Sequence, residues 1–439
     1  MKNKKTLSNL KDLFLFILII ILSSFPLLKE IKPFAVTMAR TYVSTLKLIG
    51  MIGVYFLVFN IYINFNKSED KKKYFKKILP ILILLLYMVW TLISSIYAKD
   101  TKLAFYGTIY RQEGYITYIA YAGCFGLAYC LSSKKLRKSA LYIFVIIAIL
   151  TATFAHLRSN GYLKNIIFNV DNRSASFDQF NHYGYYLLMA SAISSFLFIT
   201  EKNKIVKICN ILIYAFLLYC LIINDTFGCY LALISNFIVF FLTVIIKKEK
   251  KMPIIILISI FIITSFVVTN GKQNIASRNL TTMVKDVHNI ATKDSSKAEW
   301  GNAGTGRMIL WKYGLQFFKE RPILGHGPEN LGDKYLKVGI NQDRPHNLLI
   351  QLATTSGLPG LILYISAIGV ILVRSFKKIK MENQLHVISM FSVIAYLISA
   401  MFGNSMYYTS PYYFILLGML MSELINIDIE DSHNSQLNI

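Results

Sequence analysis

Apolar residues along this chain come in long blocks, and short charged segments separate the blocks. A helix needs about 20 apolar residues to cross the hydrocarbon core of a bilayer. About twelve blocks approach this length, and they are centred on residues 13–30, 45–65, 78–97, 115–132, 140–156, 183–200, 211–223, 229–246, 254–270, 358–373, 385–402 and 411–425. The pattern predicts an all-α polytopic membrane protein with about twelve transmembrane helices, including a tight helical hairpin across residues 224–228.

One polar segment, residues 271–356, is far longer than the other connections. It separates nine predicted spans with short outer loops (1–270) from three further spans (357–425) and a loosely ordered polar tail (426–439). The segment contains 12 Lys or Arg against 7 Asp or Glu, and several of its basic residues stand beside Gly, Pro, Asn and His. We therefore expect it to form a partly helical loop that carries the functional site and binds an anionic group.

Composition and charge narrow the class of protein. Hydrophobic residues occupy 55% of the 439 positions, too many for a protein with a wet surface. The net charge of +24 does not indicate a nucleic-acid partner, because the basic residues flank the spans: 25 lie on one predicted side and 10 in the short connections of the other. The positive-inside rule then predicts a multi-pass protein of the cytoplasmic membrane, with both termini cytoplasmic and the 271–356 loop extracytoplasmic. The first block lacks a small-residue cleavage site, so we expect it to remain as the first helix.

Two short outer connections carry polar residues at the predicted membrane surface. Arg111 precedes the fourth span, and Arg173, Asn181 and His182 precede the sixth. At that depth they can meet the head group of a lipid-linked substrate while its tail stays in the bilayer.

Within the long loop, Thr305 to Arg321 has the apolar spacing of a helix, with Thr305 as its N-cap and Pro322 after its end. Arg307 then lies in the first turn, where a cation opposes the helix dipole. Either Arg307 is a solvated residue of an amphipathic helix, or it holds a phosphate together with the free N–H groups of that turn.

A second helix is predicted to begin in the run from Pro345 to Gln351. His346 at its start is biased toward the neutral imidazole that a general base requires. It has two interpretations, a structural or capping residue and a catalytic base, and Arg344 adds a fixed cation beside it.

The sequence predicts neither a metal nor a cofactor. The acids of the loop are scattered, without D-x-D or His/Glu pairs at helical spacing, and the five cysteines have no C-x-x-C spacing. A P-loop, a dinucleotide fingerprint and a hydrolase G-x-S-x-G are also absent from the sequence. The substrate must therefore bring its own activated leaving group, for example on a lipid.

These motifs together resemble the core of the O-antigen ligase and O-antigen polymerase superfamily. The resemblance consists of Gly306-Arg307 and Trp311, P-x-x-G-x-G from Pro322 to Gly327, His346-Asn347, and G-x-x-G at the start of a span. Upstream, RSASFDQFNHYGYYL is similar to the R-x-x-(G/S)-x-F-x-x-x-N segment of the family, with the gap from Arg to Phe one residue shorter. The layout of spans and loop is also that of the family.

The resemblance implies a metal-independent, inverting glycosyltransferase on the outer face of the membrane. Its donor would be an oligosaccharide on undecaprenyl diphosphate, and its partners the glycan acceptor and membrane lipids. His346 would activate or position the acceptor hydroxyl, and Arg307 would stabilise the leaving diphosphate. The remaining predicted site residues divide into diphosphate ligands and positioning residues: Arg173, Arg111 and Arg344 for the diphosphate, and Asn347, Asn181 and Gly306 for positioning.

One departure from the family pattern concerns the hairpin. Many members have Ser-Arg-Gly at its outer end, whereas this chain has Asp225, Thr226, Phe227 and Gly228. A missing cation would weaken leaving-group stabilisation by on the order of 1 kcal/mol or more. We hypothesise that Arg111 supplies the replacement charge.

The acceptor stays open at this point. The abundance of Lys, Ile and Asn is typical of Gram-positive bacteria and favours polymerisation of repeat units, or attachment of glycan to a wall polymer or protein, over lipopolysaccharide ligation. The alternative to a polymerase is a ligase that attaches the glycan to a wall polymer, lipid or protein. A lipid-linked oligosaccharide transporter or flippase is the alternative of another class. The nearly charge-free spans argue against it, because transporters place charges near the midplane.

Overall fold

The computed structural model describes residues 2–168, 170–269, 281, 284–285, 288–289, 291–292 and 298–437. Its named helices are α1 (Lys2–Glu30), α2 (Lys32–Lys67), α3 (Lys71–Ile96), α4 (Thr101–Tyr106), α5 (Tyr115–Cys130), α6 (Lys134–Ser159), α7 (Phe180–Thr200), α8 (Lys204–Asn224), α9 (Phe227–Ile246), α10 (Met252–Thr269), α12 (Ala298–Glu320), α13 (Gly332–Lys337), α14 (Leu348–Lys378), α15 (Gln384–Ala400) and α16 (Ser410–Leu437). No strand occurs in these residues apart from a single antiparallel bridge between Ile31 and Ile167.

The all-α polytopic class is confirmed. Nine helices in the described part of the chain are long and apolar enough to cross a membrane. Three shorter apolar helices coincide with three further predicted spans: Tyr115–Cys130, Met252–Val268 and Gln384–Ala400. The total of about twelve therefore stays a prediction.

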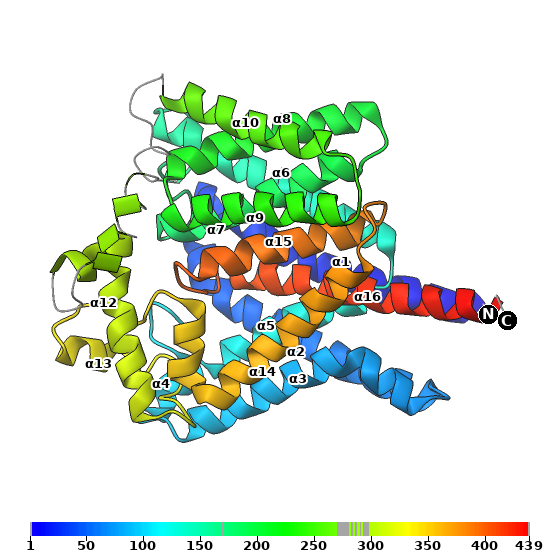
Figure 1. Ribbon diagram of the computed structural model, residues 1–439, viewed down its shortest axis with the longest axis horizontal. Coiled ribbons are helices and arrows are strands. Elements are labelled where there is room, and N and C mark those ends of the chain that lie inside the picture. Colours follow the sequence, from blue (N-terminus) through cyan, green and yellow to red (C-terminus); the bar gives the residue numbers. More distant parts are fainter. Residues whose placement is uncertain are drawn as a thin grey trace.

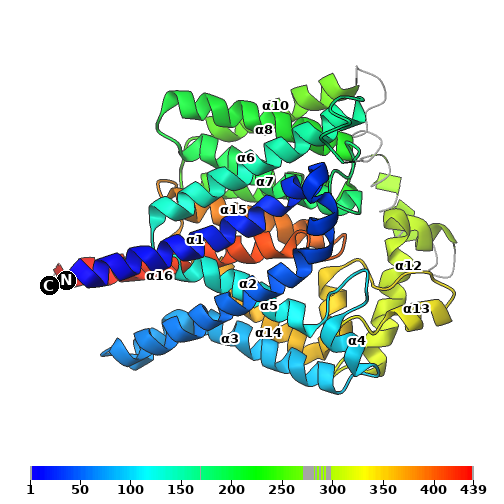
Figure 2. The same cartoon turned by 180° about the vertical axis from the view of Figure 1, so that it is seen from behind.

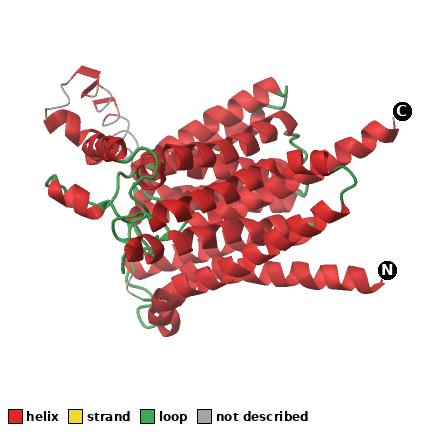
Figure 3. Ribbon diagram, turned by 90° about the horizontal axis from the view of Figure 1, so that it is seen from below, coloured by secondary structure: helices red, strands yellow, loops and turns green. Residues whose placement is uncertain are grey.

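The long helices run roughly side by side, and the two ends of the bundle differ in character. Helices α12, α13 and α4 gather with most of the long connections at one end, and both termini lie toward the other (Figures 1 and 3). The reverse view shows α1, α2 and α3 crossing the opposite face of the same bundle (Figure 2).

The basic connections meet at the end that holds the termini. Arg374 Nη1 donates to the Lys77 carbonyl at 2.9 Å, Lys138 pairs with Glu201 at 3.0 Å, and Lys247 Nζ donates to the Lys377 carbonyl at 3.3 Å. The prediction that these segments share one face is confirmed by these contacts. The assignment of that face to the cytoplasm stays a prediction.

Four glycines allow α2 and α5 to pack very closely. A Cβ at Gly53 would lie 2.1 Å from the Gly123 carbonyl oxygen, and one at Gly126 would lie 2.5 Å from the Gly53 carbonyl oxygen. Gly50 faces Ala120 in the same way, because a Cβ at Gly50 would lie 2.4 Å from the Ala120 Cα. Small residues at such spacing are how membrane helices gain backbone-to-backbone contact.

The predicted hairpin has the expected tight turn but not the expected packing. Asp225 adopts a left-handed conformation (φ 59°) after α8, and Thr226 precedes α9. Helix α8 then packs mainly on α7, and α9 mainly on α15. The turn is short because the left-handed Asp225 ends α8 and α9 begins two residues later, but the neighbours of each helix decide its direction.

Two other boundaries differ from the prediction. Helix α16 continues to Leu437 where a loosely ordered tail from residue 426 was expected, because no Gly or Pro interrupts this run. Helix α12 begins at Ala298, so Thr305 is not its N-cap, although Gly306 has φ 82° and interrupts the regular geometry just before Arg307. The predicted loop start at residue 271 lies outside the described residues.

Candidate active site

A kink in α14 creates the platform for the site. Gly357 has φ 69°, and a Cβ there would lie 1.9 Å from the Ile323 carbonyl oxygen, so only glycine fits. The break leaves the carbonyls of residues 354–356 without helical partners. His326 N–H and Gly327 N–H donate to the carbonyls of Thr354 and Thr355 at 2.8 and 2.9 Å. The predicted P-x-x-G-x-G motif is therefore the segment that closes this kink.

Helix α3 secures the same kink from the other side. Ser94 Oγ lies 2.5 Å from the Leu324 carbonyl and 2.6 Å from the Thr355 carbonyl, and Trp90 Nε1 donates to the Ser356 carbonyl at 2.7 Å. These bonds join three segments that are far apart in the sequence. The start of α14, which carries His346 and Asn347, is thereby fixed to the bundle.

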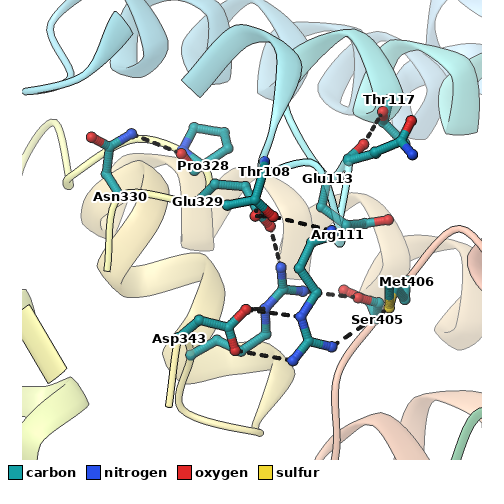
Figure 4. A network of polar contacts seen from close by, with 12 residues as sticks. Thr108, Arg111, Glu113, Thr117, Pro328, Glu329, Asn330, Asp343, Ser405 and Met406 are labelled. Atoms are coloured by element: carbon teal, nitrogen blue, oxygen red, sulfur yellow. Dashed lines mark hydrogen bonds and ion pairs between the residues drawn. The ribbon is translucent and has the colours of Figure 1, made fainter. Parts of the chain in front are cut away.

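Arg111, from the connection between α4 and α5, reaches this region and forks Asp343. Its Nε and Nη2 atoms lie 2.8 and 3.1 Å from the two Asp343 oxygens (Figure 4). Its Nη1 atom faces the Met406 sulfur at 3.7 Å, a weak acceptor. Asp343 thus orients the Arg111 guanidinium, and the edge that carries Nη1 can still bind an anion. The charges of Arg344 and Arg111 keep the pKa of Asp343 below its usual value despite partial burial.

Arg344 is almost completely buried and belongs to a second ion pair. Its side chain is 4% exposed and pairs with Glu329, which is 2% exposed. Glu329 also accepts from Thr108 Oγ1 at 3.0 Å, and Arg344 Nη1 donates to the Ser405 carbonyl at 3.4 Å (Figure 4). Arg344 therefore joins the end of the long loop to two other outer connections. Its predicted role as a diphosphate ligand stays a prediction.

Glu113, next to this pair, is a fully buried acid. Tyr121 donates its hydroxyl to Glu113 Oε1. Burial raises the pKa of Glu113 to about 8, and Arg344 opposes this rise only in part. The carboxyl is thus largely protonated at neutral pH, which avoids a net negative charge beside the arginines.

His346 lies at the start of α14, half-buried and close to these charges. It has φ 52°, and its Nε2 atom lies 3.2 Å from Gln342 Oε1. Burial, followed by the positive charge of Arg307, lowers the pKa of His346 to about 4. The imidazole is therefore neutral at pH 7, as predicted, and the cause is desolvation and neighbouring arginines.

Asn347, rather than His346, caps the helix. Its Oδ1 accepts from Ile350 N–H at 3.0 Å, and its Nδ2 donates to the Met401 carbonyl at 3.0 Å. The capping explanation for His346 is therefore wrong in this structure. Asn347 fixes the backbone next to the imidazole, and its predicted positioning role in the site stays a prediction.

Arg307 comes from α12 and is 8% exposed. Burial lowers its pKa, and its charge acts on both Tyr185 and His346. The interpretation of Arg307 as a solvated surface residue is therefore wrong. Helix α12 is held by its own small core of Leu310, Phe317, Leu331 and Tyr335, and the Tyr335 hydroxyl donates to the Leu310 carbonyl at 2.8 Å.

The upstream segment approaches the site through His182 rather than through Arg173. The Arg173 side chain is exposed and lies over the Phe180 ring at 5.0 Å. Asn181 is half-buried in the first turn of α7, and His182 beside it is 1% exposed. His182 lies within reach of the charges of Arg111 and Arg344. The roles predicted for Arg173 and Asn181 stay predictions.

The sequence reasoning missed the connection between α15 and α16, residues 401–409. Its carbonyls accept from Asn347 and Arg344, Met406 faces Arg111, and Tyr408 contacts Asp178 and lies 5.7 Å from the His182 ring. A run of Asn, Ser and two Tyr in a short outer connection was the available signal. The partners Glu329 and Asp343 were also missed, because they were read as scattered acids.

No three His, Cys, Asp or Glu side chains come together as a metal site in the part of the chain that the structure describes. The site is instead a set of arginines around a neutral imidazole, assembled from the 107–114 connection, α12, the segment before α14 and residues 401–409. Metal independence stays a prediction.

Comparisons with known proteins bear on the family resemblance that the sequence motifs indicated. Residues 212–365 match the family model described as O-antigen ligase, a range that includes Arg307, Arg344 and His346 but not Arg111 or Arg173. A protein of Rickettsia conorii, named as a proposed polysaccharide ligase, is 23% identical over 247 residues, which cover 53% of this chain and 54% of that protein. The match thus spans about half the length of that curated relative. The resemblance drawn from the sequence motifs is confirmed: residues 212–365 of this multi-pass membrane protein match the O-antigen ligase family model.

Proposed function

We propose that this protein is an inverting glycosyltransferase that moves a glycan from a polyprenyl diphosphate to an acceptor hydroxyl at the outer face of the membrane. The family match supports the coarser part of this statement, a surface polysaccharide ligase or polymerase. The observation that carries the finer part is that Arg111 and Arg344 both contact Asp343, three positions before His346, and that their charges and that of Arg307 act on this imidazole.

The arginines suit a diphosphate leaving group. Arg307 is buried, so its charge is weakly screened, and Arg111 is held by Asp343 with its Nη1 edge still available. Fixed cations aimed at the oxygen where negative charge develops stabilise the transition state more than the ground state. In this proposal Arg307 and Arg111 bind the diphosphate. Arg344 anchors the loop through Glu329, and its positive charge adds to the attraction for the diphosphate.

His346 would take the proton of the acceptor. The acceptor oxygen attacks the anomeric carbon as the bond from that carbon to the diphosphate oxygen breaks, and the electron pair leaves on the lipid diphosphate. The hydroxyl proton passes to an imidazole nitrogen. A pKa of about 4 makes His346 a weak base in the free protein. A bound diphosphate neutralises the arginine charges that act on it, so we expect the pKa to rise toward neutrality in the complex, where a base is most effective.

A second candidate concerns the acceptor. The name of the Rickettsia relative favours a ligase, in which the acceptor is a different lipid, polymer or protein rather than a growing chain. Both candidates use the same donor site. They differ in what accumulates when the site is disabled.

The test is the pattern of surface polysaccharide in cells whose only copy carries His346→Ala or Arg307→Ala, with the amount of protein in the membrane measured in parallel. Lys102→Ala is the matched control, because Lys102 is an exposed cation at the same end of the bundle. Accumulation of single lipid-linked repeat units supports a polymerase, and long chains that stay on the lipid carrier support a ligase. If both site variants match the control, the proposed site is wrong.

A further inference from the structure

A second basic cleft lies at the end of the bundle opposite the active site. It has a volume of about 690 Å³ and lies between the start of α6, the α14–α15 connection and α16. Its lining residues are Lys134, Lys135, Lys138, Lys378, Lys380, Glu382, Asn383, Gln384, Leu385, Ile427 and Glu430. The two termini lie toward this same end (Figure 1). Neither the family resemblance nor the proposed transfer reaction uses this cleft.

The charge of the lining is unbalanced. Five lysines face two glutamates. Lys138 pairs with Glu201, Lys134 lies 3.6 Å from Glu430, and Lys378 pairs with Asp428. Among the described residues, no carboxylate lies within ion-pair distance of Lys135 or Lys380, and both side chains are exposed. Lys135 and Lys380 therefore bring positive charge to the cleft that no carboxylate of the described residues neutralises at ion-pair distance.

The cleft also contains a polar donor without an acceptor. Gln384 opens α15, and its Nε2 atom is buried and makes no hydrogen bond with the described residues. An unsatisfied buried amide is costly. Gln384 lines the cleft, and a turn of its side chain would let an oxygen of an anion accept from Nε2. The N-terminal end of the 17-residue helix α15 adds to the attraction for negative charge.

The depth of the cleft fits a lipid head group. Lys134 begins one candidate span, Lys378 ends another, and Glu430 ends a third, so the lining lies where helices leave the hydrocarbon core. We expect this end in the cytoplasm from the distribution of basic residues. The cytoplasmic leaflet is rich in anionic lipids, and basic clefts between helices on that side bind their head groups.

We propose that this cleft binds the phosphate of an anionic phospholipid and thereby ties α6, α14, α15 and α16 together at the membrane surface. Lys135 and Lys380 contact the phosphate from opposite walls, and Gln384 donates a hydrogen bond to it. The chemistry that the cleft recognises is a phosphate ester with a net negative charge, which an anionic phospholipid or a soluble phosphate can present.

The experiment measures thermal unfolding of the purified full-length protein in a neutral detergent as phosphatidylglycerol or phosphatidylcholine is added. Glycerol 1-phosphate serves as the soluble arm. The test variant is Lys135→Gln with Lys380→Gln, and the matched control is Lys72→Gln with Lys76→Gln, which removes the same charge from exposed lysines of α3 at the same end.

We expect phosphatidylglycerol to raise the Tm of the parent and of the control with saturation, and phosphatidylcholine to have little effect. The test variant should need about 30-fold more phosphatidylglycerol, since each lysine near an anionic surface contributes about 1 kcal/mol. Equal effects of the two lipids, or an unchanged response of the test variant, would overturn the proposal.

Two controls keep the result interpretable. Lys135→Arg with Lys380→Arg retains the charge and should bind as the parent does, so a loss there would also contradict the proposal. If glycerol 1-phosphate protects the parent as well as the lipid does and the test variant loses this protection, the phosphate site stands and its ligand is soluble.

Discussion

A substitution of Arg111 tests the hypothesis that its guanidinium supplies the charge of the missing hairpin arginine. Arg111→Ala removes the Nη1 edge that faces the site and the two contacts with Asp343. Asp343 keeps a second cation, because Arg344 Nε lies 3.5 Å from it, so we expect the variant to fold with a loss of about 1 kcal/mol or less in stability. A hydrogen bond to a charged group is worth about 1.5–3 kcal/mol, which predicts a fall in kcat/KM of about 10- to 150-fold.

The assay is transfer of glycan from a purified lipid-linked donor by protein in vesicles. Arg111→Lys keeps the charge without the fork and should lie between the parent and Arg111→Ala. Lys102→Ala, at the same end of the bundle, should match the parent. If Arg111→Ala retains parental kcat/KM while Arg307→Ala abolishes transfer, Arg111 does not replace the missing hairpin arginine.

Three further variants test other parts of the structure. In the parent, kcat/KM should fall only as the pH drops toward about 4, because protonation of His346 removes the base. Arg111→Gln removes a positive charge, which raises the pKa of His346, so the acid side of the pH profile should move to higher pH. An unmoved profile would show that the two residues are not neighbours. Gly357→Ala should lower Tm by the equivalent of at least about 2 kcal/mol, since alanine is strained at φ 69° and its Cβ meets a carbonyl; a parental Tm in detergent would contradict the kink. Arg344→Ala leaves the Glu329 carboxylate buried and unpaired, at a cost of about 3–5 kcal/mol. Adding Glu329→Gln should recover part of that Tm, and no recovery would mean that the ion pair is not what the first change broke.

Much of the fold could be predicted from the sequence because its signals are local. Each apolar block predicted a helix where the structure has one, and Pro322 and Gly357 marked real ends and kinks. The helix that begins after His346 was predicted from a seven-residue run, since its cap lies within that run. Local capping and hydropathy need no knowledge of the rest of the chain.

The site was predicted only in part, because its pairings are not local. Arg307 and His346 were recognised from motifs, but the contact between Arg111 and Asp343 spans 232 positions. The hydrophobic periodicity of a sequence carries no information about a contact between positions so far apart. The burial of Arg344 depends on its ion pair with Glu329, and the sequence alone gave no reason to pair these two residues. The packing predicted for the hairpin was wrong for the same reason, because helices from other parts of the chain pack against α8 and α9 and set their directions.

The bond between Ser94 and Thr355 has a consequence for the order of synthesis. The two residues are separated by 261 positions, so at 5–20 residues per second the ribosome needs roughly 13 to 50 s after making Ser94 to supply its partner. During that interval the polar end of α3 has no loop to hold, and the kink of α14 cannot close. We therefore expect the arginines and the histidine of the proposed site to come together late in biogenesis, and a truncated chain that lacks α14 to insert without assembling that site.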